Sequence, residues 1–228
     1  ENNDPKVEVP QKDLTSVVLQ RVDELKEKSA LIDGVSGRTL SYYELRSQID
    51  HLATGLHQRS FKKGDVCAVF CPNLPEYATI FLGVAAIGGI NTTVNSLYSI
   101  NDLIHQFNDS KAKFLITIPE FMERALPAAE KCGIEEIFVL GEAKGATPFS
   151  ELLENDGVPP KVVIDPKNDL VALPYSSGTT GLSKGVMLTH ENLVSDMVLT
   201  TSINTLTDDD VLIGVLPFFH IYGMVLIL

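Results

Sequence analysis

The stretch YSSGTTGLSKGVMLTH, residues 175–190, gathers six serines and threonines, three glycines and one lysine between two apolar runs. A surface turn needs about two small polar residues, so this segment holds more of them than a turn requires. Gly178, Gly181 and Gly185 allow the backbone to turn sharply and to approach a ligand closely. Successive backbone N–H groups in such a loop form a concavity that binds anions. We interpret the segment as a loop that binds a charged ligand.

The side chains of the loop strengthen this interpretation, because they donate hydrogen bonds and carry a positive charge. Lys184 supplies a mobile ammonium group. Hydroxyl donors come from Ser176, Ser177, Thr179 and Thr180. Charge-assisted hydrogen bonds of this kind contribute about 1.5–3 kcal/mol each. Small donors around one cation suit a polyphosphate.

The spacing excludes two common nucleotide-binding motifs. A Walker A loop needs G-x-x-x-x-G-K-[ST] at the start of a helix, whereas Gly181 lies three residues before Lys184 and Gly185 follows it directly. The chain also contains no G-x-G-x-x-G. The alternative is a flexible surface loop that is rich in Ser, Thr and Gly. The ordered spacing favours the binding loop.

Alternating helices and apolar strands must position this loop. Apolar spacing predicts helices over residues 13–26, 41–56, 74–87, 100–108, 119–131 and 191–201. Strands are predicted over residues 30–42 (two, joined by a turn), 65–70, 88–94, 113–118, 136–140, 170–175, 185–189 and 210–217. Ser41 and Glu44 form a capping box, and Asn73 is expected to cap the helix that follows it. The alternation predicts an α/β fold, layered α-β-α with a largely parallel sheet.

Composition divides the chain into two parts. Residues 141–168 are rich in Gly, Pro and charge, and we expect a surface connection with one short helical piece. We therefore predict a first α/β subdomain over residues 1–168 and the start of a second, with the loop, over residues 169–228. The apolar stretch 212–228 is interrupted by Pro217 and His220 and lacks a basic flank, which favours a buried segment over a transmembrane anchor.

Charge and cysteine content limit the possible partners. The formal net charge of −12 disfavours nucleic acid as a partner, because an acidic surface repels a phosphate backbone. Cys67, Cys71 and Cys132 show no metal-ligand spacing, and their odd number suits a reducing compartment. We expect buried thiols and no metal held by these residues.

The loop sequence SSGTTGLSKGVMLTH resembles the phosphate-loop signature of the adenylate-forming enzymes. This superfamily includes acyl- and aryl-CoA synthetases, firefly-type luciferases and the adenylation modules of peptide synthetases. The resemblance covers the whole chain through the blocks LSYYELRSQIDHLATGL, PNLPEYATIFLGVAAIGGINTTVNSLYS and LPFFHIYGM. The last block, together with LPYSSGTTGLSKGVMLTHENL, is most similar to 4-coumarate–CoA ligase-like acyl-CoA synthetases. Ser183 stands where proline is commoner in the family.

The resemblance implies that the loop closes over the β- and γ-phosphates of ATP, with Mg²⁺ bridging phosphate oxygens. The matching phosphate-contacting positions are Ser176, Ser177, Gly178, Thr179, Thr180, Gly181 and Lys184. Lys184 is also implied to be catalytic, because donors aimed at a leaving pyrophosphate stabilise charge that develops in the transition state.

Two residues match the aromatic-histidine block beside the acyl pocket. The resemblance implies that His220 is catalytic and lines the channel for the carboxylate and the acyl-adenylate, and that the Tyr222 ring packs against the acyl or aryl group. Without the resemblance, a core histidine and a core tyrosine would be the plainer interpretations. His190 is expected to cap or pack near the following helix. The remaining histidines show no constellation and are assigned no role: His51, His57 and His105.

The resemblance further implies an acid–thiol ligase as the full-length parent. This enzyme would activate an aromatic or fatty carboxylic acid as an acyl-adenylate, release pyrophosphate and transfer the acyl group to coenzyme A. The chain would be an N-terminal fragment without the C-terminal lid domain, inactive alone, from an intracellular protein that is cytoplasmic or peroxisomal. A luciferase-like oxygenase, an adenylation module that loads a carrier protein and a non-catalytic nucleotide-binding domain remain as alternatives.

Overall fold

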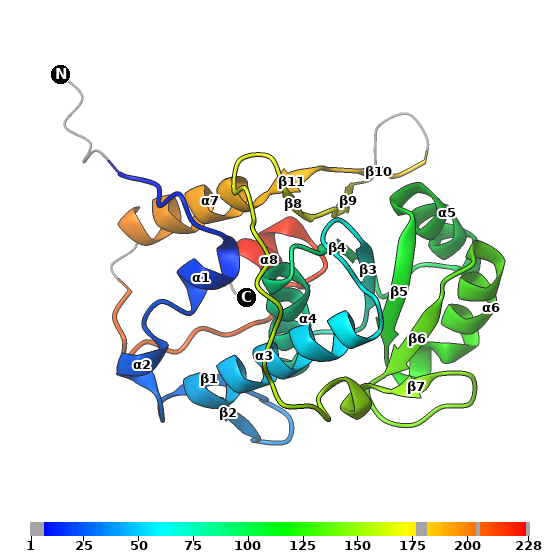
Figure 1. Cartoon of the computed structure of the whole chain (residues 1–228), viewed down its shortest axis with the longest axis horizontal. Coiled ribbons are helices and arrows are strands. Elements are labelled where there is room, and N and C mark those ends of the chain that lie inside the picture. The colour runs from blue at the N-terminus through cyan, green and yellow to red at the C-terminus, as the bar shows by residue number, and fades with distance from the viewer. Residues whose placement is uncertain (1–6, 177–181, 204–205, 227–228) are drawn as a thin grey trace.

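A seven-stranded sheet forms the centre of the computed structural model, which describes residues 7–176, 182–203 and 206–226 (Figure 1). The strand order is β11-β8-β4-β3-β5-β6-β7. The strands are β3 (Val66–Phe70), β4 (Ile90–Thr93), β5 (Ala112–Thr117), β6 (Glu136–Val139), β7 (Thr147–Pro148), β8 (Leu170–Ala172) and β11 (Leu188–Thr189). Every pair in this sheet is parallel except β11 with β8. The predicted α/β fold with a largely parallel sheet is confirmed.

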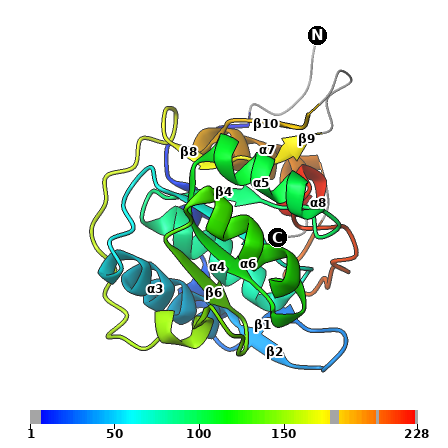
Figure 2. The ribbon, with the colours of Figure 1, turned by 90° about the vertical axis from the view of Figure 1, so that its right-hand side faces the viewer.

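Helices cover both faces of this sheet (Figures 1 and 2). The principal helices are α1 (Leu14–Val18), α3 (Tyr42–Gln58), α4 (Pro75–Ala86), α5 (Ile100–Ser110) and α6 (Met122–Cys132). α3 packs on α4, and α5 packs on α6. The chain moves from β3 to β4 in one direction along the sheet and from β4 through β5 to β6 in the other. Because crossovers between parallel strands are right-handed, α4 lies on one face while α5 and α6 lie on the opposite face.

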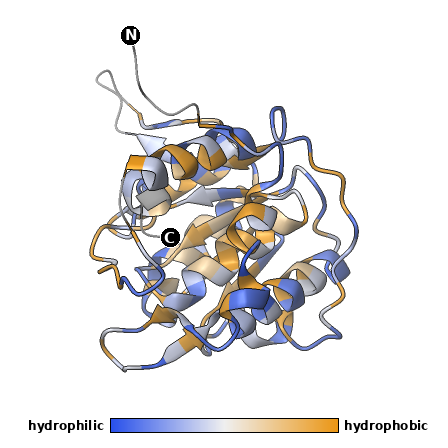
Figure 3. Ribbon diagram, turned by 90° about the vertical axis from the view of Figure 1, so that its left-hand side faces the viewer, coloured by the Kyte–Doolittle hydropathy of each residue, from blue (hydrophilic) through white to orange (hydrophobic). Residues whose placement is uncertain are grey.

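The centre of the sheet is completely buried. All five residues of β3 are buried, and α4 buries nine of its twelve residues because its sequence is apolar nearly all round. Figure 3 shows hydrophobic residues concentrated in the helices and strands at the centre of the molecule. Cys67 and Cys71 belong to this core, and their burial raises the pKa of both thiols. Cys132 is half-buried.

Local signals located most helix starts correctly. The Ser41 side chain accepts from the Glu44 N–H, and the Glu44 carboxylate accepts from the Ser41 N–H, which completes the predicted capping box of α3. The predicted hairpin is present as β1 (Ser29–Ile32) and β2 (Thr39–Ser41). The single helix expected over residues 13–26 is instead two short helices, α1 and α2 (Val22–Leu25): Leu14 and Val17 of α1 join the main core, whereas α2 packs on α3. The connection over residues 141–168 contains β7 and the single-turn helix η2 (Phe149–Leu152), and a similar turn, η1 (Pro119–Phe121), precedes α6.

Two local expectations were wrong. Asn73 does not cap α4, whose N-cap is Leu74 without a side-chain hydrogen bond, because Pro75 already starts the helix and leaves the Asn73 amide free to bind elsewhere. Residues 210–217 contain no strand. A strand requires a neighbour, and among the described residues none pairs with this segment, in which four of the five large aliphatic residues are exposed: Val211, Leu212, Ile213 and Val215. Within the ranges given above, no helix combines the length and apolar content that a bilayer crossing requires.

His190 forms a hydrogen bond with helix α1, 176 positions earlier in the chain. It begins α7 (His190–Ile203), is fully buried, and its Nδ1 accepts a hydrogen bond of 3.1 Å from the Leu14 N–H. The expectation that His190 packs near this helix is therefore confirmed. Burial lowers the pKa of His190 below its ordinary value of 6.5, because the neutral ring is the form that fits the apolar surroundings.

We expect Gly55→Ala to destabilise the protein that carries this chain by about 1–3 kcal/mol or more, through overpacking of α3 against η2. A Cβ at residue 55 would lie 2.1 Å from the Leu152 carbonyl oxygen, which is backbone and cannot move away cheaply. Denaturant unfolding measures the effect. Gly34→Ala is the matched control, because its Cβ would meet no atom within 4 Å. Equal stability of the two variants would contradict the packing described for α3.

We expect the free energy of unfolding to decrease as the pH falls below 6.5, in part through His190. The pKa is lower in the folded chain, so the unfolded chain takes up the proton first and protonation favours unfolding. One such group contributes at most about 1.4 kcal/mol per pH unit. In His190→Asn, the amide oxygen can accept from the Leu14 N–H without titrating, so urea titrations between about pH 5 and pH 6.5 should show a shallower slope. Identical slopes in both proteins would exclude His190 as a contributor.

Candidate functional site

Three segments meet at the carboxyl edge of the parallel strands. β3 ends at Phe70 and leads to Asn73, and β4 ends at Thr93. β8 leads into the antiparallel pair formed by β9 (Tyr175–Ser176) and β10 (Lys184–Gly185). In open α/β sheets, ligands bind outside this edge, at the place where the strand order reverses. In this sheet the strand order reverses beside β3, because β4, the next strand in the sequence, lies on one side of β3 and β5 lies on the other side.

The predicted binding loop is a hairpin whose two arms are β9 and β10. Lys184 lies directly opposite Ser176 in this pair. Opposite residues of an antiparallel pair project from the same face, so the ammonium and the hydroxyl lie on one face of the hairpin. Both residues are exposed, and no hydrogen bond or ion pair joins either side chain to the described part of the chain. Both remain available to an anion.

The other predicted phosphate contacts lie between the two arms in the sequence. Ser177, Gly178, Thr179, Thr180 and Gly181 lie outside the described residues, so their roles remain predictions. Val186 N–H donates to the Pro174 carbonyl oxygen at 2.8 Å and continues the pairing of the two arms toward the sheet.

Helix α5 contacts both arms of the hairpin. The Tyr175 hydroxyl donates to the Asp109 carboxylate at 2.5 Å, and the His105 Nε2 lies 2.9 Å from the Ser183 carbonyl oxygen. Burial raises the pKa of Tyr175, and the hydrogen bond to Asp109 raises it further. The sequence predicts no role for His105 or Asp109. Their spacing of four, which places them on one face of a helix, was the signal available for them.

The aromatic-histidine block is held by side chains at the same edge. The Asn73 amide nitrogen donates to the carbonyl oxygens of Gly214 and Leu216 at 3.0 and 2.8 Å, and its oxygen accepts from the Phe218 N–H at 2.9 Å. The Thr93 hydroxyl donates to the Phe219 carbonyl oxygen at 2.8 Å. This clamp fixes the backbone directly before the predicted site histidine.

His220 and Tyr222 follow this clamp and are exposed. The Tyr222 N–H lies 3.3 Å from the His220 Nδ1, and the short helix α8 (Ile221–Leu226) begins between the two residues. Tyr222 is 57% exposed, so it is not the core tyrosine of the plainer interpretation. Nor is His220 a buried, satisfied histidine in the described structure.

Strand β4 links the hairpin to the aromatic-histidine block. Its polar residues Asn91, Thr92 and Thr93 are buried, although this position in a parallel sheet ordinarily favours apolar side chains. The Thr92 hydroxyl donates to the Leu173 carbonyl oxygen at 3.1 Å, two residues before β9, while Thr93 donates to Phe219. Adjacent residues of one strand therefore hold the stems of both predicted site segments.

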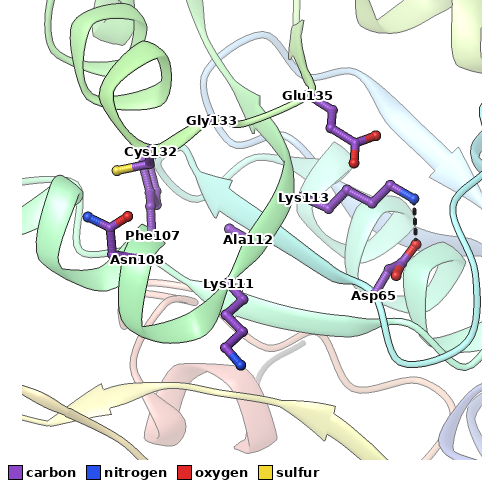
Figure 4. A pocket seen from close by; sticks show the side chains of 9 residues that line it. All are labelled: Asp65, Phe107, Asn108, Lys111, Ala112, Lys113, Cys132, Gly133 and Glu135. Atoms are coloured by element: carbon purple, nitrogen blue, oxygen red, sulfur yellow. Dashed lines mark hydrogen bonds and ion pairs between the residues drawn. The ribbon is translucent and has the colours of Figure 1, made fainter.

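The described residues contain no group of three or more His, Cys, Asp or Glu side chains that could hold a metal ion. They also contain a cavity of about 440 Å³ at the opposite, amino edge of the sheet (Figure 4). Lys113, one of the two lysines that line it, lies 2.8 Å from the Asp65 carboxylate and 2.7 Å from the Ser60 carbonyl oxygen. Lys113 is therefore already paired, and the cavity lies at the edge of the sheet opposite the hairpin. We assign the cavity no part in the site.

Comparison with known proteins identifies similar sequences. The sequence profile described as AMP-binding enzyme matches residues 18–228. The chain is 36% identical over 244 residues to a protein from Dictyostelium discoideum named probable 4-coumarate–CoA ligase 1, covering 98% of this chain and 44% of that protein. It therefore spans less than half the length of this relative.

Solved structures show the same fold. A long-chain-fatty-acid–CoA ligase from Archaeoglobus fulgidus matches with a TM-score of 0.89 and 27% identity, covering 99% of this chain and 46% of that chain. An ATP-bound structure of MatB from Rhodopseudomonas palustris matches with a TM-score of 0.81 and 28% identity, covering 93% and 42% of the two chains.

We expect Asn73→Ala to destabilise the protein by about 2–3 kcal/mol, because three hydrogen bonds to the backbone of residues 214–218 are lost together. Hydrogen exchange should show faster exchange of the Phe218 amide, which loses its acceptor. Asn95→Ala is the control, since within the described ranges the Asn95 side chain accepts only from the Leu97 N–H two residues away. Unchanged exchange at Phe218 in Asn73→Ala would disprove the clamp.

Proposed function

Since the chain belongs to the AMP-binding enzyme family, we propose that the protein carrying it is an acid–thiol ligase that activates a carboxylic acid as an acyl-adenylate and then transfers the acyl group to coenzyme A. The chain covers less than half of its named relatives, so this activity is proposed for the protein that carries it and not for residues 1–228 alone. Coenzyme A is the proposed acceptor because sequence relatives that match most of this chain, and a matching solved structure, are named as CoA ligases. This favours a ligase over an oxygenase or a carrier-protein-loading module.

The observation that carries the proposal is the pair Ser176 and Lys184. A hydroxyl and an ammonium stand opposite each other on one face of a hairpin, exposed and without an acidic partner among the described residues. In a chain with a formal net charge of −12, a cation left unpaired at the carboxyl edge of the sheet suits an anionic ligand. The donor set therefore fits the phosphates of ATP.

The proposed chemistry follows from the position of Lys184. When a substrate carboxylate attacks the α-phosphorus, the bond to the pyrophosphate breaks and negative charge grows on the departing oxygens. An ammonium held near those oxygens stabilises the transition state more than the ground state. Ser176 and the predicted donors of the hairpin tip would orient the same phosphates.

The acyl group is proposed to lie on the side of His220 and Tyr222. Both are exposed at the carboxyl edge, on a backbone fixed by Asn73 and Thr93. The imidazole would bind the carboxylate or the acyl-adenylate, and the Tyr222 ring would pack against the acyl or aryl chain. Either an aromatic or a fatty acid is compatible with these two groups.

Mg²⁺ is proposed as a partner of the nucleotide. Because the described residues offer no cluster of carboxylates for it, phosphate oxygens would supply its ligands on this side of the site. When bound, it would neutralise phosphate charge that Lys184 and the hydroxyls do not reach. The proposed division into subdomains at residue 168, and a cytoplasmic or peroxisomal location, complete the hypothesis.

We expect Lys184→Ala to lower the rate of carboxylate-dependent exchange between pyrophosphate and ATP by a factor of about 10²–10³. The physical reason is the loss of the positive charge beside the leaving group. The exchange assay on the protein that carries this chain, with an aromatic and a fatty acid tested in turn, measures this rate.

Lys161→Ala is the matched control, because Lys161 is exposed in the connection before β8 and makes no hydrogen bond to a described residue. Its exchange rate should equal that of the unmodified protein. Normal exchange in Lys184→Ala would exclude the proposed role of the lysine, and absence of exchange with every acid in the unmodified protein would exclude the ligase.

A further inference from the structure

We propose that helix α5 sets the geometry of the phosphate-binding hairpin, with His105 and Asp109 as positioning residues for ATP. This inference rests on the proposed function. It concerns side chains that do not themselves reach a phosphate and act only through the two arms of the hairpin.

Each arm of the hairpin has its own anchor on α5. On the β9 arm, the Tyr175 hydroxyl donates to the Asp109 carboxylate at 2.5 Å. On the other arm, His105 Nε2 lies 2.9 Å from the carbonyl oxygen of Ser183, the residue directly before Lys184. The first bond is charge-assisted, which makes it about twice as strong as a neutral one. Because the anchors lie at both stems, they define where the hairpin leaves the sheet and how it is inclined.

The Tyr175 ring connects the two anchors. It packs edge-on against the His105 ring, with centroids 6.4 Å apart. It also lies across the backbone of the opposite arm, since a Cβ on Gly185 would approach the ring carbons to 3.2 Å. Gly185 follows Lys184 and thus makes room for the aromatic ring. The ring, the imidazole and both arms form one packed unit.

The base of this unit is itself rigid. α5 begins with a capping box between Ser99 and Asp102. The fully buried Gln106, which lies between the two anchors in sequence, donates to the Thr92 hydroxyl at 2.8 Å and to the Thr93 carbonyl oxygen at 3.1 Å. These bonds fix α5 to the end of β4. The hairpin is therefore held, through α5, by the same strand that holds the aromatic-histidine block.

The anchors are expected to affect substrate binding more than the chemical step. A hairpin held in place binds the phosphates without first losing conformational freedom, in the ground state and the transition state alike. Loss of such uniform binding raises KM and leaves kcat nearly unchanged. Lys184 differs, because its loss is expected to lower kcat.

The test measures KM for ATP and kcat on the protein that carries this chain. Asp109→Ala and Tyr175→Phe should each raise KM about tenfold, the effect of one charge-assisted hydrogen bond, with kcat changed less than about twofold. Their combination should raise KM no further than either alone, because both remove the same bond. Asp109→Asn retains an oxygen that accepts from the phenol and should restore most of the affinity.

The second anchor is tested with His105→Ala, for which we expect a rise in KM of about threefold. His105→Gln, which retains an N–H donor, should lie closer to the unmodified protein. Asn108→Ala is the matched control: Asn108 is exposed on the same helix turn and makes no hydrogen bond to the described part of the hairpin. Its KM should be unchanged.

Additive effects of Asp109→Ala and Tyr175→Phe, a fall in kcat at constant KM, or failure of Asp109→Asn to restore affinity would overturn the proposal. Hydrogen exchange over residues 182–186 separates this outcome from failure of the proposed function. If the unmodified protein exchanges no pyrophosphate, the role in ATP binding fails with the ligase. Faster amide exchange in Asp109→Ala than in Asn108→Ala would still support the anchor, and equal exchange would exclude it.

Discussion

The contact between strands β4 and β8 is the constraint on which the rest of the site depends. Three consecutive buried polar residues of β4 each donate to a later segment of the chain: Asn91 to the Val171 carbonyl oxygen, Thr92 to Leu173 and Thr93 to Phe219. A buried donor without a partner costs about 1–3 kcal/mol, so these side chains specify one register for β8 and one path for the backbone before His220. The polar strand INTT in an otherwise apolar sheet is explained by this task.

The same edge collects the groups that could do chemistry. The carboxyl ends of parallel strands release loops on one side of the sheet, and here those loops carry Lys184 and Ser176 on one hairpin and His220 and Tyr222 on the next segment. Side chains behind them already have partners within the chain: Asn73 binds backbone carbonyl oxygens, and Asp109 accepts from the Tyr175 hydroxyl. The residues on the loops are therefore free to bind a ligand, whereas the residues behind them hold the loops in position.

The opposite edge shows the contrast. In the cavity there, Lys113 is paired with Asp65. A paired charge has little free energy to offer a ligand, because binding would first have to replace its partner. The candidate site is therefore assigned to the carboxyl edge, where the hairpin and the aromatic-histidine block meet.

What the sequence alone determined is the local and periodic part of this protein. Alternating apolar periods predicted the layers, Ser41 and Glu44 predicted the start of α3, and the spacing of Gly, Ser, Thr and Lys predicted a binding loop. These signals act within one or two turns of the chain, so sequence order is sufficient to detect them. Only the tertiary structure decided that Asn73 binds residues 141 to 145 positions away instead of capping α4. It also decided that residues 210–217 form no strand and that Asp109 meets Tyr175 across 66 positions. Such partners are chosen by how helices and strands pack, and no local pattern of residues specifies which distant carbonyl or hydroxyl will face a given side chain.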